Sequence, residues 1–214
     1  DGSELYDPVN WENQIPCIAD DVEAWKQDWR MPNAEIEIQA PVAGFMGSDI
    51  LAALMAIDIT QKTEPILLAD FGTNTEIALW DGSQIWLTSV PGGPAFEGVG
   101  LEHGLSAELG AIKAVSQNND TFNLDIIGGG EAIGFCASGF VDAIALLRSQ
   151  NIIKLSGRFS QPNPDGYFLD KDNPYTAIKS SDIDAFQRAK AATAAAMQQL
   201  LVLANISAHN LSEL

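Results

Sequence analysis

Two strand-length runs joined by a short polar segment place the tightest constraint on how this chain can fold. Residues 66–69 form an apolar run, and residues 75–80 form a second run in which apolar and polar side chains alternate. Runs of these lengths and patterns are typical of β-strands. The segment between them, Asp70-Phe71-Gly72-Thr73-Asn74, is rich in the polar and glycine residues that favour turns. The sequence therefore predicts a tight β-hairpin.

The turn of this hairpin carries groups that suit a phosphate ligand. Gly72 lets the backbone approach a ligand closely and adopt positive φ. Successive backbone N–H groups, helped by the Thr73 hydroxyl and the Asn74 amide, can hold phosphate oxygens. Asp70 stands at the end of the first strand, where a carboxylate could hold Mg²⁺ and its waters. The turn is therefore the first candidate binding site in this chain.

A third strand and a glycine-rich loop follow the hairpin. Asp81-Gly82 is a turn signal, and residues 83–90 are expected to form a strand, which gives three consecutive antiparallel strands. Residues 91–100 then hold four glycines and two prolines around Glu97, as expected where backbone must come close to a ligand. Glu97 is a candidate to orient a metal-bound water or to bind a ligand hydroxyl. The alternative is a solvated glutamate at the start of a helix.

Length and charge restrict the class of protein. A chain of 214 residues with 46% apolar and 19% charged residues is expected to form one folded α/β unit. Its 29 acidic and 11 basic residues give a formal charge of −18. This balance argues against nucleic acid and against an anionic membrane surface as partners. The charge is explained by solubility, and a basic protein partner is the other interpretation.

Cysteine usage and hydropathy bear on the setting of the protein. Cys17 and Cys136 are too few for a disulfide framework or for the four thiolates of an ordinary iron–sulfur cluster. The apolar stretches are too short and too interrupted to span a bilayer, and the first residues lack the pattern of a signal peptide. We expect a cytoplasmic protein.

The first third of the chain predicts two helices around a strand and a loop. Four apolar residues spaced by four, three and four predict a helix from residue 18 that packs through two tryptophans: Ile18, Val22, Trp25 and Trp29. Residues 35–38 alternate as a strand, residues 41–47 form a glycine-containing loop, and Ser48 or Asp49 caps a helix over residues 50–57. The loop could hold a ligand group at the helix N-terminus, or its glycines could only allow close packing.

The middle of the chain predicts a second hairpin and a glycine-led helix. Residues 110–116 and 121–127 predict its two strands, and a glycine cluster follows at 128–130. Residues 134–139, Gly-Phe-Cys-Ala-Ser-Gly, then lead into a helix over residues 140–147 and suggest an anion or ribose-phosphate site. The segment lacks the Gly-Lys-Ser/Thr of a Walker loop. Cys136 has no nearby His or Lys in sequence and is expected to be a buried structural thiol.

The last third predicts an irregular segment followed by a long helix. Residues 155–176 contain three prolines with several Asp and Asn residues and are expected to form a surface excursion. Residues 181–184, Ser-Asp-Ile-Asp, resemble a capping box with Asp in place of Glu or Gln. The alanine-rich helix that follows is expected to end near Ala204. Its apolar and small residues recur at helical spacing, with Lys190 among them.

Taken in order, four of these segments resemble motifs of one family. They are residues 43–49, 70–76, 93–98 and 134–142, and together they resemble the C-terminal ATPase region of the reductive activators of corrinoid proteins. That family belongs to the superfamily of sugar kinases, heat-shock ATPases and actin. The similarity covers roughly residues 36–211. The usual family pattern has Gly where this chain has Thr75, which would tighten or reshape the turn.

The resemblance implies a fold, a cofactor and a set of site residues. The fold would be a ribonuclease-H-like lobe whose mixed sheet opens with three antiparallel strands and is flanked by helices. The cofactors would be ATP and Mg²⁺, with hydrolysis coupled to electron transfer to the cobalt of a corrinoid protein. Asp70 and Glu97 would be catalytic, and Asp70 would bind the metal. The cofactor-binding residues would be Gly72, Thr73, Asn74, Glu76, Gly93, Gly98, Gly134, Ser138 and Gly139.

Departures from the family pattern divide the expected function into alternatives. The four cluster cysteines of a ferredoxin-like domain, a first lobe and a terminal adenosine-binding turn have no counterpart in this sequence. We therefore expect an acidic, tryptophan-containing extension over residues 1–33 and one incomplete lobe over residues 34–214. The missing domains or a corrinoid protein would be its partners, and a homo-oligomer is possible. The other interpretations are a non-catalytic binding module on the same scaffold and a divergent small-molecule kinase lobe.

Overall fold

The computed structural model describes residues 19–36, 46–92, 95–96, 100–118 and 121–212. The helices are α1 (Ala19–Asp28), α2 (Ser48–Ala56), α3 (Ala137–Ser149) and α4 (Ser180–Leu203), with short 3₁₀ turns η2 (Ile59–Gln61), η4 (Pro174–Thr176) and η5 (Ala208–Asn210). The strands are β1 (Ile66–Phe71), β2 (Thr75–Trp80), β3 (Ile85–Val90), β4 (Ala111–Asn118), β5 (Thr121–Ile126), β6 (Gly134–Phe135), β7 (Tyr167–Phe168) and β8 (Ala177–Ile178). Among the described helices, none is both long and apolar enough to cross a membrane.

Strands β1, β2 and β3 form an antiparallel sheet in that order, which confirms the predicted opening of the lobe. The register pairs Ile66 with Trp80 and continues to Phe71 opposite Thr75. Strand β1 is thus two residues longer than its apolar run, and Asp70 belongs to the ladder. The turn is correspondingly shorter, from residue 72 to residue 74. Strand β3 begins at Ile85, not at residue 83, because the Asp81 carboxylate accepts hydrogen bonds from the backbone N–H groups of residues 83 and 84.

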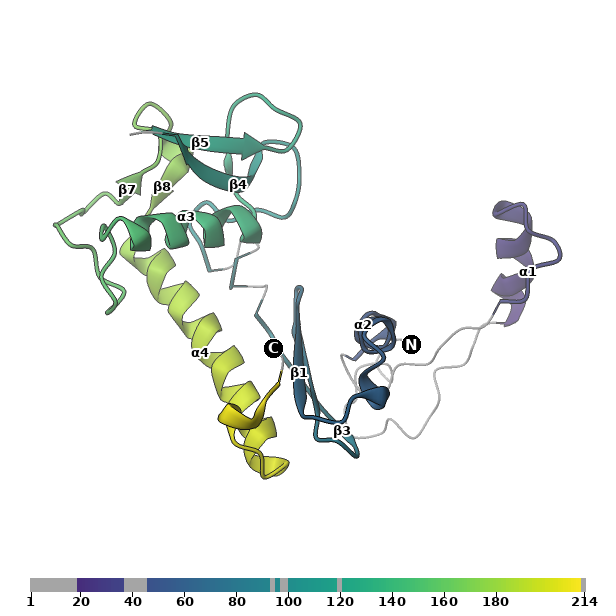
Figure 1. Ribbon diagram of the computed structural model, residues 1–214. Coiled ribbons are helices and arrows are strands. Elements are labelled where there is room, and N and C mark those ends of the chain that lie inside the picture. Colours follow the sequence, from purple (N-terminus) through teal and green to yellow (C-terminus); the bar gives the residue numbers. More distant parts are fainter. Residues whose placement is uncertain (1–18, 37–45, 93–94, 97–99, 119–120, 213–214) are drawn as a thin grey trace, which may run out of the picture.

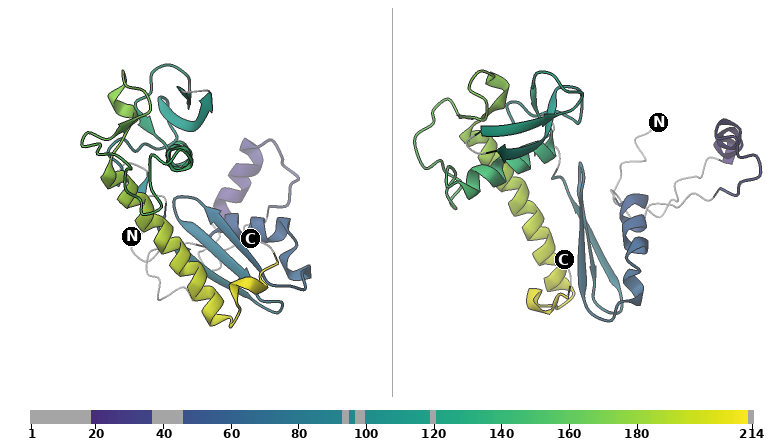
Figure 2. Two further views of the ribbon diagram at one scale, coloured as in Figure 1. Left: turned by 60° about the vertical axis from the view of Figure 1, so that its left-hand side comes forward. Right: turned by 45° about the horizontal axis from the view of Figure 1, so that its top comes forward.

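Helices α2 and α4 cover opposite faces of this first sheet (Figures 1 and 2). On one face, Ile50 and Leu54 of α2 pack with Ala78 and Trp80 of β2. On the other face, Leu200 and Leu201 of α4 pack with apolar residues of β1 and β2: Leu67, Ile77 and Leu79. Because side chains alternate along a strand, even-numbered residues of β1 and β2 face α2 and odd-numbered residues face α4.

A second, mixed sheet and helix α3 form the other half of the molecule. Strand β4 pairs antiparallel with β5 and parallel with the two-residue β6. Their core joins apolar residues of β4, α3, β8 and the start of α4, including Ile112, Phe140, Leu147, Ile178 and Ile183. Helix α4 thus packs on the second half with its first turns and on the first sheet with its last turns (Figure 1).

The start of α4 is fixed by Asp182, and it lies two residues earlier than predicted. Lys179 is the N-cap, and its backbone N–H donates to Asp182 Oδ2 at 2.7 Å. The Asp182 Oδ1 atom accepts from the backbone N–H of Glu102 at 3.1 Å. The capping box predicted at residues 181–184 is therefore wrong by two residues, since the carboxylate that satisfies the helix terminus belongs to Asp182.

The Lys179 side chain adds an ion pair at this junction. Its ammonium lies 2.6 Å from a Glu102 carboxylate oxygen. The hydrogen bond from Lys179 lowers the pKa of Glu102, and the same bond raises the pKa of Lys179. The pair links the segment after the glycine-rich loop to the first turn of α4.

Other predicted elements differ in detail. Residues 155–176 are not wholly irregular, since β7 pairs with β8 and the Asn173 side chain donates to the Ala132 carbonyl at 2.9 Å. Of the strand predicted at residues 35–38, the two described residues have no regular structure, and the others lie outside the described residues. The predicted loop at 41–47 lies mostly outside them too. Trp25 of α1 and Trp29, which directly follows α1, stack on each other with ring centroids 5.8 Å apart.

Candidate functional site

A cavity of about 860 Å³ lies where the tip of the β1–β2 hairpin, the first turns of α3 and the middle of α4 meet. We call it the central cavity. Most of its lining is apolar, with aromatic rings from Phe71, Phe96 and Phe186. Its polar and charged lining comes from a few residues: Thr73, Thr75, Ser138, Asp142, Lys190 and Thr193. A largely apolar cavity with a few polar groups is typical of a small-molecule site.

The hairpin turn meets the central cavity through Gly72 and Thr73. The Gly72 N–H donates to the Asn74 carbonyl at 2.9 Å, so this amide closes the turn on itself. Phe71 and Thr75, which flank the turn and pair with each other, also line the cavity. The Phe71 side chain is 71% exposed, which is unusual for a large apolar residue and places it at the mouth.

Thr75 directly follows the turn, and Gly92 leaves room for its side chain. Thr75 is 2% exposed and faces the cavity side of the first sheet. A Cβ atom placed on Gly92 would lie 2.7 Å from Thr75 Oγ1, closer than real Cβ contacts allow. The threonine therefore packs against a backbone that has no side chain at Gly92, and its predicted effect on the shape of the turn stays a prediction.

Asp70 and Glu76 lie on the other face of the hairpin. They are directly opposite each other in the β1–β2 register and, by alternation, face the α2 side. Glu76 is 6% exposed and accepts a hydrogen bond from Ser89 Oγ at 3.1 Å. Neither carboxylate lines the central cavity, nor does Asn74. The structure thus divides the predicted residues of this turn between two faces.

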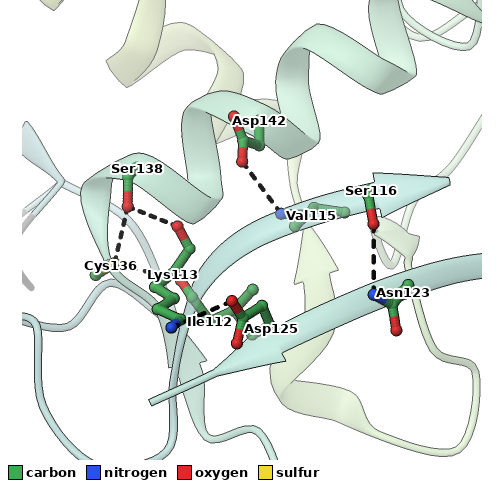
Figure 3. A network of polar contacts seen from close by, with 9 residues as sticks. All are labelled: Ile112, Lys113, Val115, Ser116, Asn123, Asp125, Cys136, Ser138 and Asp142. Atoms are coloured by element: carbon green, nitrogen blue, oxygen red, sulfur yellow. Dashed lines mark hydrogen bonds and ion pairs between the residues drawn. The ribbon is translucent and has the colours of Figure 1, made fainter.

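Helix α3 is docked onto the free edge of β4 by three successive hydrogen bonds (Figure 3). Strand β6 pairs with β4 only at Ala111 and Ile112. Beyond that pair, the Cys136 N–H donates to the Ile112 carbonyl at 3.1 Å, and Ser138 Oγ donates to the Lys113 carbonyl at 2.7 Å. The Val115 N–H donates to Asp142 Oδ2 at 3.2 Å. Side chains of α3 therefore continue the hydrogen bonding that a longer β6 would have supplied.

The edge that α3 covers is irregular. The register with β5 shifts between Ile112 and Ala114, so Lys113 is the extra residue of a β-bulge. Its carbonyl is the one that accepts from Ser138, and its ammonium pairs with Asp125 at 3.2 Å. Ser138 and Asp142 are four residues apart, which places them on one face of α3. This spacing lets the two side chains reach the Lys113 carbonyl and the Val115 N–H on β4.

Two glycines of the segment 134–139, which leads into α3, have close backbone neighbours. A Cβ atom on Gly139 would lie 2.1 Å from the Ile112 carbonyl oxygen, and one on Gly134 would lie 2.4 Å from the His103 carbonyl oxygen. Neither glycine lines the central cavity, whereas Ser138 does. Packing of α3 and β6 thus accounts for both glycines, and their predicted role in cofactor binding stays a prediction.

Cys136 is a buried free thiol, as predicted. It is the N-cap of α3, and its Sγ lies 3.4 Å from the Ile112 carbonyl oxygen and from Ser138 Oγ. Its side chain contributes to the cavity wall. Because the thiol has these neighbours and little exposure, it contributes to packing at the start of the helix.

The α4 wall of the cavity is the part that sequence reasoning did not single out. It consists of Phe186, Ala189, Lys190, Thr193, Ala194 and Met197, which recur at helical spacing. Lys190 supplies the one cation on the lining formed by described residues. Helical periodicity put these residues on one face, but it could not show that this face borders a cavity.

Three of the predicted site residues belong to the glycine-rich loop after β3. Glu97, Gly93 and Gly98 lie outside the described residues. Within the described ranges, no group of three or more His, Cys, Asp or Glu side chains could hold a metal ion by itself.

Comparison with known proteins assigns the chain to a family. The model of the family described as the C-terminal domain of RACo, the ASKHA domain, matches residues 64–214. The corrinoid activation enzyme RamQ of Eubacterium limosum is 32% identical over 183 residues, covering 75% of this chain and 30% of the relative. The [Co(II) methylated amine-specific corrinoid protein] reductase of Methanosarcina barkeri is 28% identical over 203 residues, covering 85% of this chain and 36% of the relative.

A solved structure supports the same assignment. A reductive activator for corrinoid, iron-sulfur protein superposes with a TM-score of 0.65 at 29% identity, covering 85% of this chain and 32% of that one. The chain thus spans about a third of the length of each of these proteins. The match confirms the predicted fold class and the resemblance on which it was based. The chain belongs to the family of C-terminal ASKHA domains of RACo-type proteins.

Proposed function

We propose that this chain is the nucleotide-binding lobe of an ATP-dependent reductive activator of corrinoid proteins. The observation that carries the proposal is the central cavity, where the hairpin turn, the start of α3 and the middle of α4 meet. Three relatives whose names describe corrinoid activation or reduction support the choice of process. ATP hydrolysis would drive an electron from an iron–sulfur domain outside this chain to the cobalt of a corrinoid protein.

The residues of the cavity fit a nucleotide. Its volume of about 860 Å³ lies in the range of small-molecule sites. The hairpin turn at Thr73 and the N-terminus of α3, a helix of 13 residues, present backbone and hydroxyl groups of the kind that bind phosphate. The apolar rings and methyl groups offer surface for a base or ribose. We propose that Gly72, Thr73 and Ser138 contact the nucleotide.

Magnesium is a separate part of the proposal. Mg²⁺ is usually bound through one or two carboxylates together with phosphate oxygens and waters. Asp70 ends the strand that leads into the turn, and it is the carboxylate we propose for this role. Because Asp70 faces the α2 side, the proposal also predicts that the phosphates approach the hairpin from its tip.

Catalysis is expected to need more than this chain supplies. Phosphoryl transfer depends on preorganised groups on both sides of the phosphates. We propose that a further lobe supplies the second side and that Glu97 orients the attacking water. A reducing, cytoplasmic setting is part of the proposal, supported by a chain with two cysteines, of which Cys136 is a buried free thiol.

Calorimetric titration of the chain with Mg-ATP and Mg-ADP tests the proposal. We expect saturable binding that Asp70→Ala abolishes and that Asp165→Ala, at an exposed residue outside the cavity lining, leaves unchanged. Hydrolysis should appear when the other lobe of a RACo-type protein is added, and Asp70→Ala should remove it. Absence of binding up to about 10 mM nucleotide, well above the 1 mM that corresponds to 4.1 kcal/mol, would contradict the proposal.

A non-catalytic binding module is the second candidate. The observation that favours it is the apolar mouth of the cavity, where Phe71 is 71% exposed and Val141 is 42% exposed. Under this alternative, Phe71→Ser would weaken binding of a partner domain, while Asp70→Ala would leave it unchanged. A large loss of partner binding in Asp70→Ala would exclude the alternative.

A further inference from the structure

Lys190 is a cation on the wall of a cavity in a strongly acidic protein. The chain carries a formal charge of −18, yet the described lining of the central cavity contains one lysine and one carboxylate, Asp142. The ion pairs among described residues are Lys26–Glu23, Lys113–Asp125 and Lys179–Glu102. Within the described part of the chain, Lys190 thus has no carboxylate within 4.0 Å of its ammonium.

The neighbours of Lys190 on its own helix explain why it is unpaired there. Helical ion pairs form between residues three or four positions apart. For Lys190 those positions hold Phe186, Gln187, Thr193 and Ala194, none of which carries a charge. Lys190 is thus an exposed lysine on the wall of the cavity with no ion-pair partner along its own helix.

The carboxylate on the α3 wall of the cavity is engaged elsewhere. Asp142 Oδ2 accepts from the Val115 N–H at 3.2 Å, which ties this carboxylate to the docking of α3 on β4. The walls around Lys190 are largely apolar, with Phe186, Ala189 and Met197 from its own helix. Of the two charged groups in the described lining, the Lys190 ammonium is therefore the one available to an anionic ligand near α4.

We propose that Lys190 binds the phosphate groups of the nucleotide and is the main charged determinant of affinity for phosphorylated over unphosphorylated ligands. This inference rests on the proposed function, because it names the group in the same cavity that recognises the ligand charge. A lysine ammonium is a compact point charge on a flexible stem, which suits contact with phosphate oxygens from a helix wall. The hairpin turn and the start of α3 would then orient the phosphates that Lys190 attracts.

Affinities for a ligand series, measured by calorimetry on the full chain, test the role of Lys190. The ligands are adenosine, AMP, ADP and ATP, the last two with Mg²⁺, and the variants are Lys190→Met and Lys190→Arg. Hydrogen bonds to charged groups predict that Lys190→Met weakens ADP and ATP binding by about tenfold or more. Adenosine binding should be unchanged, and Lys190→Arg should keep most of the affinity. Lys154→Met, at an exposed residue outside the cavity, is the matched control.

The outcomes separate this inference from the proposed function. If the wild-type chain binds ATP and Lys190→Met binds it equally well, the role of Lys190 is overturned while the proposed function stands. An equal loss for adenosine and ATP would also overturn it, because the lysine would then contact the base or the ribose, or support the wall. If the wild-type chain binds no member of the series, the proposed function fails, and the inference fails with it. Circular dichroism of each variant checks that α4 is retained.

Discussion

The carboxylate of Asp142 on α3 accepts a hydrogen bond from the backbone N–H of Val115 on β4, across 27 positions of sequence. Val115 lies two residues after the β-bulge at Lys113, in the part of β4 that does not pair with β6. The bond is the last of three hydrogen bonds between the start of α3 and β4, after those donated by the Cys136 N–H and by Ser138 Oγ. The first turns of α3 thus reach the central cavity because their side chains replace a strand along β4.

Replacing Asp142 should therefore destabilise the fold. We expect Asp142→Ala to lower the free energy of unfolding by about 1–3 kcal/mol, because it leaves the Val115 N–H without its acceptor. Asp142→Asn keeps an acceptor oxygen and should cost less. Urea denaturation followed by circular dichroism measures both. An Asp142→Ala variant as stable as wild type would show that water replaces the carboxylate at no cost.

Gly139 should tolerate no side chain, since α3 approaches β4 too closely there. A Cβ atom at this position would lie 2.1 Å from the Ile112 carbonyl oxygen, which is backbone and cannot turn away. We expect Gly139→Ala to cost about 2–4 kcal/mol, although alanine is the better helix former. The reverse exchange at an exposed position of the same helix, Ala145→Gly, should cost about 1 kcal/mol by propensity alone.

The comparison of these two variants decides between packing and propensity. If Gly139→Ala stabilises the protein, as helix propensity alone would predict, then α3 does not pack on β4 as closely as the structure shows. Denaturation curves of both variants at one pH supply the test.

The hairpin could be predicted from sequence because its signals are local. The alternation in residues 75–80 and the polar residues before it were sufficient to predict that the two strands pair and where the turn lies. Alternation also separates Asp70 from Phe71 onto opposite faces. Which face meets the central cavity could not be predicted, since it depends on contacts with α4 residues such as Leu200, more than a hundred positions away.

The motif from Gly134 to Asp142 shows a different limit. Its glycines and hydroxyl resemble a ligand-binding loop, and sequence reasoning assigned them to a nucleotide. In the structure Gly139 and Ser138 contact the backbone of residues 112 and 113, which lie in a strand whose bulge has no sequence signal of its own. A motif of this kind can both dock α3 on β4 and contribute to a ligand site, because docking the helix also brings its N-terminus to the central cavity.

The turn before β3 should make stability depend on pH. The Trp86 Nε1–H donates to Asp81 Oδ2 at 2.8 Å, and the Gln84 N–H donates to Oδ1 at 2.8 Å. These bonds, the one from Trp86 first, hold the pKa of Asp81 well below its ordinary value. The unfolded chain therefore binds the proton more readily, so the contribution is complete above about pH 4 and is lost as the pH falls below that value.

Two variants isolate this contribution. Asp81→Asn should be less stable than wild type at pH 7, and the difference should shrink as the pH falls below about 4. Trp86→Phe removes the largest cause of the pKa shift and should reproduce part of the effect. Urea denaturation between pH 7 and pH 3 measures it. A difference between wild type and Asp81→Asn that stays constant over this range would contradict the assignment.

Thr75 and Gly92 should be energetically coupled, because the Thr75 side chain fills the space that a side chain at position 92 would need. A Cβ atom on Gly92 would lie 2.7 Å from Thr75 Oγ1, so Gly92→Ala alone should destabilise the protein by about 1–3 kcal/mol through overpacking. Thr75→Ala removes the hydroxyl that causes the clash. In that background Gly92→Ala should cost less, with a coupling of about 1 kcal/mol in a double-mutant cycle of unfolding free energies. If the costs of the two substitutions were strictly additive, the side chain of Thr75 and the backbone of Gly92 would not pack together as the structure shows.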